Sequence, residues 1–143
     1  MNLQAYHTLK EEDQMLHVRR KGIFTGKAPK PVGPYSQAIT ADGVVFVSGQ
    51  LGMAGGELAA DAPGQARLAL ENMRSILEAA GASMEDVVKT TVLLADMNDF
   101  AAVNAVYAEF FTEPFPARAA YQVAGLPLGA AVEIEAVALM KEE

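Results

Sequence analysis

Two short stretches, FPARAA at 115–120 and VEIEA at 132–136, set the frame for the rest of the sequence. Each is an apolar, strand-like run that carries a charged side chain, Arg118 in the first and Glu133 in the second. A charge within an apolar strand is costly to bury unless it meets a partner or a ligand. We therefore expect the fold to deliver these two groups to a cleft.

The residues themselves leave more than one role open for these charges. The planar guanidinium of Arg118 matches a carboxylate ligand bidentately, but an ion pair with Glu133 or Glu135 would also satisfy it. The two glutamates are in phase on one face of a strand that also carries Val137 and Leu139. In an apolar pocket, one glutamate would have the raised pKa of a general base; both could equally be solvated. Spacing does not choose between them.

The composition is that of one compact domain. The chain has 143 residues, 51% of them hydrophobic, which suits a single core and leaves no room for two. No apolar run approaches 18 residues and the polar N-terminus lacks the apolar segment of a secretory signal, so we expect a cytoplasmic protein without a membrane span. The formal charge of -7 disfavours nucleic acid as a partner. With no cysteine, and with His7 and His17 lacking ligand spacing, no metal site is expected.

The first part of the chain predicts strands joined by shaped loops. A strand is expected from Met15 to Arg19, and the prolines and glycines of 25–34 exclude a helix or central strand there. Asp42-Gly43 predicts an antiparallel hairpin, because glycine tolerates the positive φ of such turns. Residues 51–58 form either an irregular connection or a second tight hairpin.

The middle of the chain predicts two amphipathic helices separated by a strand at 87–94. The first helix is capped by Asp61 and ended by Gly81. Its apolar face is expected to hold Ala66, Leu70, Met73, Leu77 and Ala80, and its outer face Gln65, Arg67, Glu71, Arg74 and Glu78. The second helix follows Asp96–Asp99 and ends before Glu113-Pro114, with an apolar face of Phe100, Val103, Tyr107, Phe110 and Phe111. Two such helices cover one face of a mixed sheet.

The other face of that sheet also needs cover. Strands are predicted at 118–123 and 131–140, and several strands of the chain have no polar face. A chain with two helices cannot hide both faces of a sheet alone, so we expect a homo-oligomer with closed symmetry.

Three further residues stand at positions where a site is one of the alternatives. Tyr35 follows a rigid Gly-Pro turn, where its hydroxyl serves either a cleft or the core. Gly49 lies near a strand end, where a ligand or another backbone can come close. Asn104 lies off the core face of the second helix, which favours a surface residue. No Ser-His-Asp arrangement and no phosphate loop is visible.

Taken together, the motifs of residues 22–140 resemble the RidA/YjgF family of enamine/imine deaminases. The resemblance rests on six segments: GPYSQAI at 33–39, VSGQ at 47–50, QARLALENMRSILEAAG at 65–81, VVKTTVLLADMNDFAAVNAVYAEFF at 87–111, FPARAA at 115–120 and VEIEAVA at 132–138. It implies a RidA-like domain over 21–143, preceded by an N-terminal extension at 1–20. The fold it implies is α+β and chorismate-mutase-like, with two helices on one face of a mixed sheet. The assembly it implies is a barrel-like homotrimer with active sites between subunits.

The resemblance also implies an activity and roles for residues. It implies hydrolysis of 2-aminoacrylate and 2-iminopropionate to a 2-oxo acid and ammonia, with no cofactor. By position, Arg118 resembles the arginine that grips the substrate carboxylate and Glu133 the glutamate that positions the attacking water. Tyr35, Gly49 and Asn104 resemble pocket residues. Ala120 stands where many members have cysteine, and its backbone groups remain available.

Two other functions remain as alternatives. One is a non-catalytic ligand-binding regulatory trimer that kept the pocket, and retention of both Arg118 and Glu133 weighs against it. The other is a ribonuclease or translation inhibitor, an activity attributed to some relatives. The negative charge and the lack of a basic stripe or histidine pair in the sequence weigh against that alternative.

Overall fold

The computed structural model describes residues 2–5 and 19–141. Six strands form one sheet in the order β1-β2-β3-β8-β6-β7, and β4 pairs with β5 in a small separate hairpin. The strands are β1 Arg20–Ile23, β2 Ala38–Ala41, β3 Val44–Leu51, β4 Met53–Ala54, β5 Glu57–Leu58, β6 Val87–Leu94, β7 Ala117–Gln122 and β8 Val132–Leu139. The helices are α2 Ala62–Ala79 and α3 Phe100–Tyr107, with 3-10 turns η1 Met84–Asp86, η2 Met97–Asp99 and η3 Pro127–Gly129.

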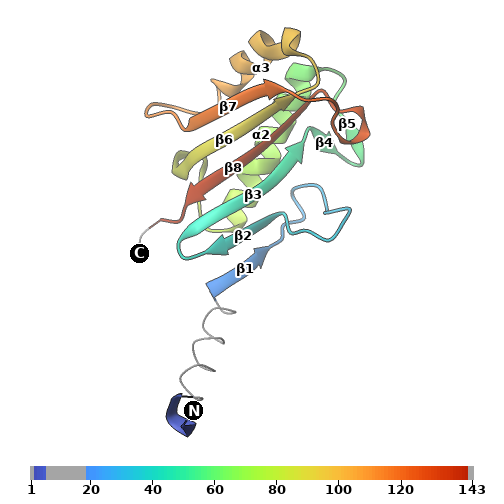
Figure 1. Cartoon of the computed structure of the whole chain (residues 1–143). Coiled ribbons are helices and arrows are strands. Elements are labelled where there is room, and N and C mark those ends of the chain that lie inside the picture. Colours follow the sequence, from blue (N-terminus) through green and yellow to red (C-terminus); the bar gives the residue numbers. More distant parts are fainter. Residues whose placement is uncertain (1, 6–18, 142–143) are drawn as a thin grey trace.

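The sheet is mostly antiparallel, and both helices lie on the same side of it (Figure 1). Only the pair β6–β7 is parallel, and α3 makes the crossover that a parallel connection requires. Helix α2 packs behind β3 and β8 and contacts α3. This confirms the predicted α+β class with two helices on one face.

The predicted hairpin and first helix are confirmed in detail. Asp42 and Gly43 have φ of 50° and 80° and join β2 to β3, with Ala41 paired to Val44. The Asp61 side chain accepts a hydrogen bond from the Gly64 amide at 2.8 Å, which satisfies a free N–H at the start of α2. Gly55 and Gly56, both at positive φ, turn the second hairpin.

The core fills the layer between the sheet and the helices. The five residues predicted for the inner face of α2 are all buried, and the inward side of β8 meets them. That side consists of Val132, Ile134, Ala136 and Ala138, each between 0% and 4% exposed. The predicted alternation of the last strand is therefore confirmed.

Three predictions about these elements need correction or fall outside the described residues. Gln65 was expected on the outer face of α2 but is buried, because its amide bonds two loops. Helix α3 ends at Tyr107, since the next residues tighten into i→i+3 bonds. The strand expected from Met15 lies almost entirely outside the described residues, as do His7 and His17; the first described strand begins at Arg20.

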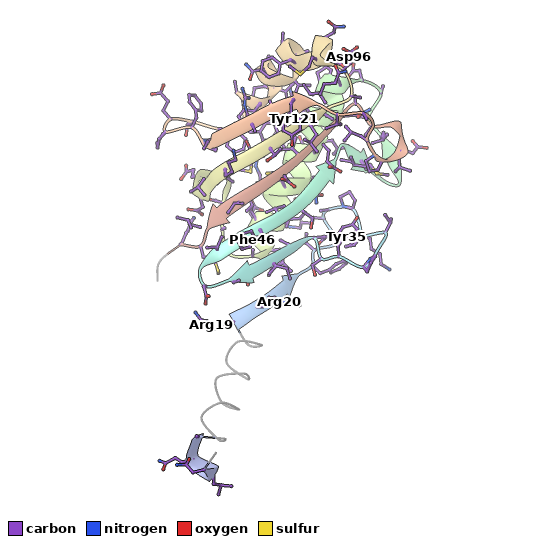
Figure 2. All side chains as sticks on the ribbon, viewed as in Figure 1. Arg19, Arg20, Tyr35, Phe46, Asp96 and Tyr121 are labelled. Carbon is purple, nitrogen blue, oxygen red and sulfur yellow. The ribbon has the colours of Figure 1, made fainter. Side chains whose placement is uncertain are left out.

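The outward face of the sheet carries exposed apolar side chains. Phe46 of β3 is 49% exposed and Tyr121 of β7 is 51% exposed, and Figure 2 shows both on the face turned away from α2. Val137 of β8 pairs with Phe46 across this face. In the described ranges, no helix is long and apolar enough to cross a membrane.

Candidate active site

A large cavity opens beside the outward face of β3 and β8. Its volume is about 1180 Å³, and it is lined by the predicted site residues Tyr35, Gly49 and Glu133, together with Glu135. Tyr35 comes from the loop before β2, and its side chain is half exposed (Figure 2). Part of the remaining lining is apolar and comes from the loop 26–32, from β4 and from η3. The cavity can therefore hold a small organic acid with its reactive end at the glutamates.

Glu133 lies directly over the backbone of Gly49. The pairing of β3 with β8 shifts between Val47 and Gln50, and Gly49 sits within this irregularity. A Cβ atom built on Gly49 would lie 2.8 Å from Cδ of Glu133 and 3.0 Å from its Oε2. A side chain at position 49 would therefore displace the Glu133 carboxylate, which lies against this backbone at the cavity wall.

The surroundings of Glu133 hold its pKa above the ordinary value for a glutamate. Partial burial is the main cause, since it penalises the charged carboxylate, and the neighbouring charge of Glu135 adds to the effect. A raised pKa makes the carboxylate a better proton acceptor and donor near neutral pH. The contact with Gly49 singles out Glu133, whereas spacing in the sequence left both glutamates as candidates.

Arg118 occupies a different environment: it lies on β7, and its side chain packs against α3. Its Nη1 donates a hydrogen bond to Oδ1 of Asn104 at 2.8 Å. Its guanidinium carbon lies 4.7 Å from the ring centroid of Tyr107 and 5.6 Å from that of Phe100. In the described part of the chain its hydrogen-bond partner is this amide, and neither Glu133 nor Glu135 forms an ion pair with it.

Arg118 and Glu133 lie on opposite faces of the sheet. Glu133 alternates with Ile134, which is fully buried under the helices, so its carboxylate faces the other way. Arg118 is in register with Thr90 of β6, whose hydroxyl contacts Tyr107 of α3. The guanidinium is therefore on the helix side. Within one chain the two charges do not share a cleft.

The predicted site residues thus fall into two groups. Tyr35, Gly49 and Glu133 line the cavity, whereas Arg118 and Asn104 meet at the edge strand β7. Ala120 belongs with the second group, because it lies two residues beyond Arg118 on the same face and packs against the core. One group carries a carboxylate and a phenol, and the other a guanidinium.

Buried amides that the sequence analysis did not single out shape the cavity. Oε1 of Gln37 accepts from the Thr25 amide at 2.7 Å, and its Nε2 donates to the carbonyl oxygens of Thr25, Ala28 and Pro29 at 3.1, 3.4 and 3.0 Å. Asn72 of α2 donates to the carbonyl oxygen of Met53 at 3.0 Å. These residues could have been identified in the sequence as amide side chains at core positions, because a buried amide needs hydrogen-bond partners such as backbone groups.

The described ranges contain no group of three or more His, Cys, Asp or Glu side chains placed to hold a metal ion. The polar side chains at the cavity include the carboxylates of Glu133 and Glu135, the phenol of Tyr35 and the hydroxyl of Ser48, together with Lys27 and Lys30. Such a set can position a water molecule and transfer a proton.

Comparison with known proteins decides the family. A sequence model of the family described as Endoribonuclease L-PSP matches residues 25–140. The chain is 54% identical over 123 residues to the human "2-iminobutanoate/2-iminopropanoate deaminase", a match that covers 84% of this chain and 90% of the relative. The chain belongs to the RidA/YjgF family. A "RutC family protein" of Pyrococcus horikoshii is 53% identical over 119 residues, covering 81% of this chain and 94% of that protein.

Solved structures of the RidA/YjgF family share the fold. RidA from the Antarctic bacterium Psychrobacter sp. PAMC 21119 superimposes with a TM-score of 0.82 at 48% identity, covering 84% of this chain and 99% of that one. Escherichia coli TdcF with bound serine gives a TM-score of 0.81 at 45% identity, covering 85% of this chain and 99% of that one. The family expected from the sequence motifs and the α+β class of the fold are thereby confirmed.

Proposed function

We propose that this protein hydrolyses reactive 2-imino acids and their enamine tautomers, such as 2-aminoacrylate and 2-iminopropionate, to 2-oxo acids and ammonia. The observation that carries the proposal is the carboxylate of Glu133, held against Gly49 at the wall of an open cavity with its pKa raised. Relatives more than half identical over most of this chain are named as 2-iminobutanoate/2-iminopropanoate deaminases, which supports the assignment.

In the proposed reaction, Glu133 acts on water. The carboxylate accepts a proton as the water oxygen bonds to the imine carbon, and the C=N double bond becomes a single bond. The carbinolamine then collapses: its C–N bond breaks, a C=O bond forms, and the proton returned to nitrogen lets ammonia leave. The backbone carbonyl near Ala120 is a second holder of the water. No redox step and no cofactor is needed, because a protonated imine is already electrophilic.

Arg118 supplies the other half of the site. Its guanidinium binds the substrate carboxylate and orients the imine carbon toward the water. Asn104 acts through Arg118 by accepting its Nη1 hydrogen bond, and the Tyr35 hydroxyl faces the substrate from the cavity. Because Arg118 and Glu133 lie on opposite faces of one chain, we place each active site between two copies, with Arg118 from one and Glu133 from the next.

The same proposal gives the assembly and its setting. A chorismate-mutase-like homotrimer, with the outward faces of three sheets forming a barrel-like interior, would cover Phe46, Val137 and Tyr121 together. We place this trimer in the cytoplasm, with small imino acids as its partners and neither nucleic acid nor membrane. The extension at 1–20 and the domain at 21–143 remain the proposed division of the chain.

The test couples a threonine or serine dehydratase to this protein and follows the imine by trapping with semicarbazide. Wild type should shorten the lifetime of the imine, and Arg118→Ala should lower kcat/KM by about 10- to 100-fold or more, because a hydrogen bond to a charged group contributes about 1.5–3 kcal/mol. Arg67→Ala is the matched control, since Arg67 forms an exposed ion pair with Glu109 far from both groups of site residues. No acceleration by wild type would reject the proposal and leave the regulatory trimer.

The family description names an endoribonuclease, so RNA cleavage is the second activity to assay. The net charge of -7 opposes binding to a phosphate backbone. We expect RNA cleavage to stay at background. Cleavage that survives repurification of the protein and is lost in Glu133→Gln would contradict this expectation.

A further inference from the structure

Three residues of α3 hold the guanidinium of Arg118. Asn104 accepts its Nη1 hydrogen bond at 2.8 Å, and the rings of Tyr107 and Phe100 lie 4.7 and 5.6 Å from its central carbon. Positions 100, 104 and 107 are spaced four and three residues apart, so their side chains share one face of the helix. Both rings lie within cation–π range of the guanidinium, and Tyr107 is the nearer of the two.

The ring of Tyr107 is itself fixed in place. Tyr107 is 6% exposed, and its hydroxyl lies 2.7 Å from Oγ1 of Thr90, which is fully buried. The ring also packs against Phe111, with 4.5 Å between centroids. Thr90 is the register partner of Arg118 on the neighbouring strand. Thr90 therefore pairs with the strand that carries Arg118 and also contacts the hydroxyl of Tyr107, whose ring supports the guanidinium.

We propose that Tyr107, anchored by Thr90, is a positioning residue that presents the guanidinium of Arg118 to the carboxylate of the substrate. An exposed arginine has about 2 kcal/mol of rotamer entropy to lose when it binds a ligand. A side chain already held by a ring and an amide has lost much of it in the free protein, which favours binding. The inference rests on the proposed function, because it assigns Arg118 the carboxylate.

The geometry leaves the binding edge of the guanidinium free. The guanidinium carbon lies over the Tyr107 ring, and in the described residues the hydrogen bond of the guanidinium is that of Nη1 to Asn104. The N–H groups of Nη2 and Nε remain for the two oxygens of a carboxylate. Burial raises the pKa of Tyr107, against the smaller lowering effects of Thr90 and Arg118, so the phenol stays neutral and does not compete as an anion.

The test compares binding of 2-oxobutanoate with that of its amide, 2-oxobutanamide, to the full-length protein by NMR titration. Wild type should prefer the carboxylate, and Arg118→Ala should lose that preference. Tyr107→Leu should lower the preference about two- to thirty-fold, the range that a cation–π contact of about 0.5–2 kcal/mol gives. Tyr107→Phe keeps the ring but removes the hydroxyl that contacts Thr90, so it should lower the preference several-fold, as Thr90→Val does, and by no more than Tyr107→Leu.

Two controls separate positioning from a general structural effect. Phe110→Leu removes a ring of the same segment that packs against Arg74 instead of Arg118, so it should leave the preference unchanged. If Tyr107→Leu does not fold, Thr90→Val decides, because it frees the ring at little change in volume and should lower the preference several-fold. The inference is overturned if Tyr107→Leu folds and keeps the wild-type preference for the carboxylate. If that variant does not fold, the same result for Thr90→Val overturns it.

The result is also separable from the proposed function. Binding of a 2-oxo acid needs no turnover, so a protein that fails to accelerate imine loss but shows the predicted preferences would reject the deaminase and keep the role of Tyr107. Conversely, an active deaminase whose Tyr107→Leu variant keeps the full carboxylate preference would reject only the role of Tyr107.

Discussion

At the residue scale, the proposed chemistry depends on Glu133 and the glycine beneath it. The carboxylate is partly buried, close to a like charge and pressed against backbone, and each of these conditions follows from its position on β8 opposite an irregular part of β3. A glutamate at the end of an ordinary strand would be hydrated and acidic. Here the strand pairing itself creates the environment that a proton-transfer group needs.

The raised pKa of Glu133 predicts the pH dependence of the reaction. As a general base, Glu133 must be ionised, so kcat/KM should fall as pH drops through a pKa higher than that of an ordinary glutamate. Glu135→Gln removes the like charge and should move this acidic limb to lower pH. The profile is measured with dehydratase in excess at every pH. This account would be contradicted if the acidic limb of the pH profile stayed at the same pH in Glu135→Gln or moved to higher pH.

The same pKa shift has a consequence for stability. Because the folded-state pKa lies above the unfolded one, protonated Glu133 favours the folded state, and this contribution is lost as pH rises through the folded pKa. Glu133→Gln should therefore gain stability relative to wild type above that pKa and lose activity at every pH. Urea denaturation at a low and a neutral pH measures the first effect.

Gly49→Ala should reduce kcat by about 100-fold, with KM changed less. The added Cβ would lie 2.8 Å from Cδ of Glu133, so the carboxylate must move, and a displacement near 1 Å can cost about that factor. Gly125→Ala is the control: its φ is not positive, and nothing lies within 4 Å of the new Cβ. Gly49→Ala with wild-type kcat would mean that the position of Glu133 is not critical.

At the scale of elements, one buried glutamine joins α2 to the loops on either side of the cavity. Nε2 of Gln65 donates to the carbonyl oxygen of Ala59 at 3.0 Å, and its Oε1 accepts from the amide of Ala131 at 2.8 Å. Ala131 immediately precedes β8, so this amide fixes the start of the strand that carries Glu133. It links a helix and a strand that are 66 residues apart.

Gln65→Leu should destabilise the fold by about 1–3 kcal/mol, because it leaves a backbone donor and a backbone acceptor without partners. Gln122→Leu makes the same chemical change at an exposed site, where Gln122 accepts from the Met97 amide and water can replace the bond. Its effect should stay within about 0.5 kcal/mol. Chemical denaturation measures both, and equal effects would show that the buried amide has no special role.

Features of the fold that depend on residues close together in the chain were predictable from the sequence. The hairpin at Asp42-Gly43, the cap at Asp61 and the alternation of β8 all depend on residues close together in the chain, and all are confirmed. The burial of Gln65 depends on loops distant in sequence, so helical periodicity assigned it to the wrong face. Likewise, Arg118 is flanked by alanines, whose small size gives no preference between the faces of β7.

At the scale of the whole molecule, the faces assigned to Arg118 and Glu133 matter most. The motifs identified both residues, yet no local pattern indicates that one points to the helices and the other away from them. Under the proposed function, each chain therefore contributes Arg118 to one active site and Glu133 to another. In that proposal a second copy takes part in the chemistry and also covers the apolar face of the sheet.

The most direct test of this central claim is complementation between two inactive variants. Arg118→Ala and Glu133→Gln are co-expressed with different affinity tags and purified on both, so that every trimer contains both kinds of subunit; light scattering checks the mass. Each mixed ring then has one boundary at which an intact Arg118 meets an intact Glu133. The account predicts about one third of wild-type kcat per trimer. Activity no higher than that of either variant alone would contradict a site shared between subunits.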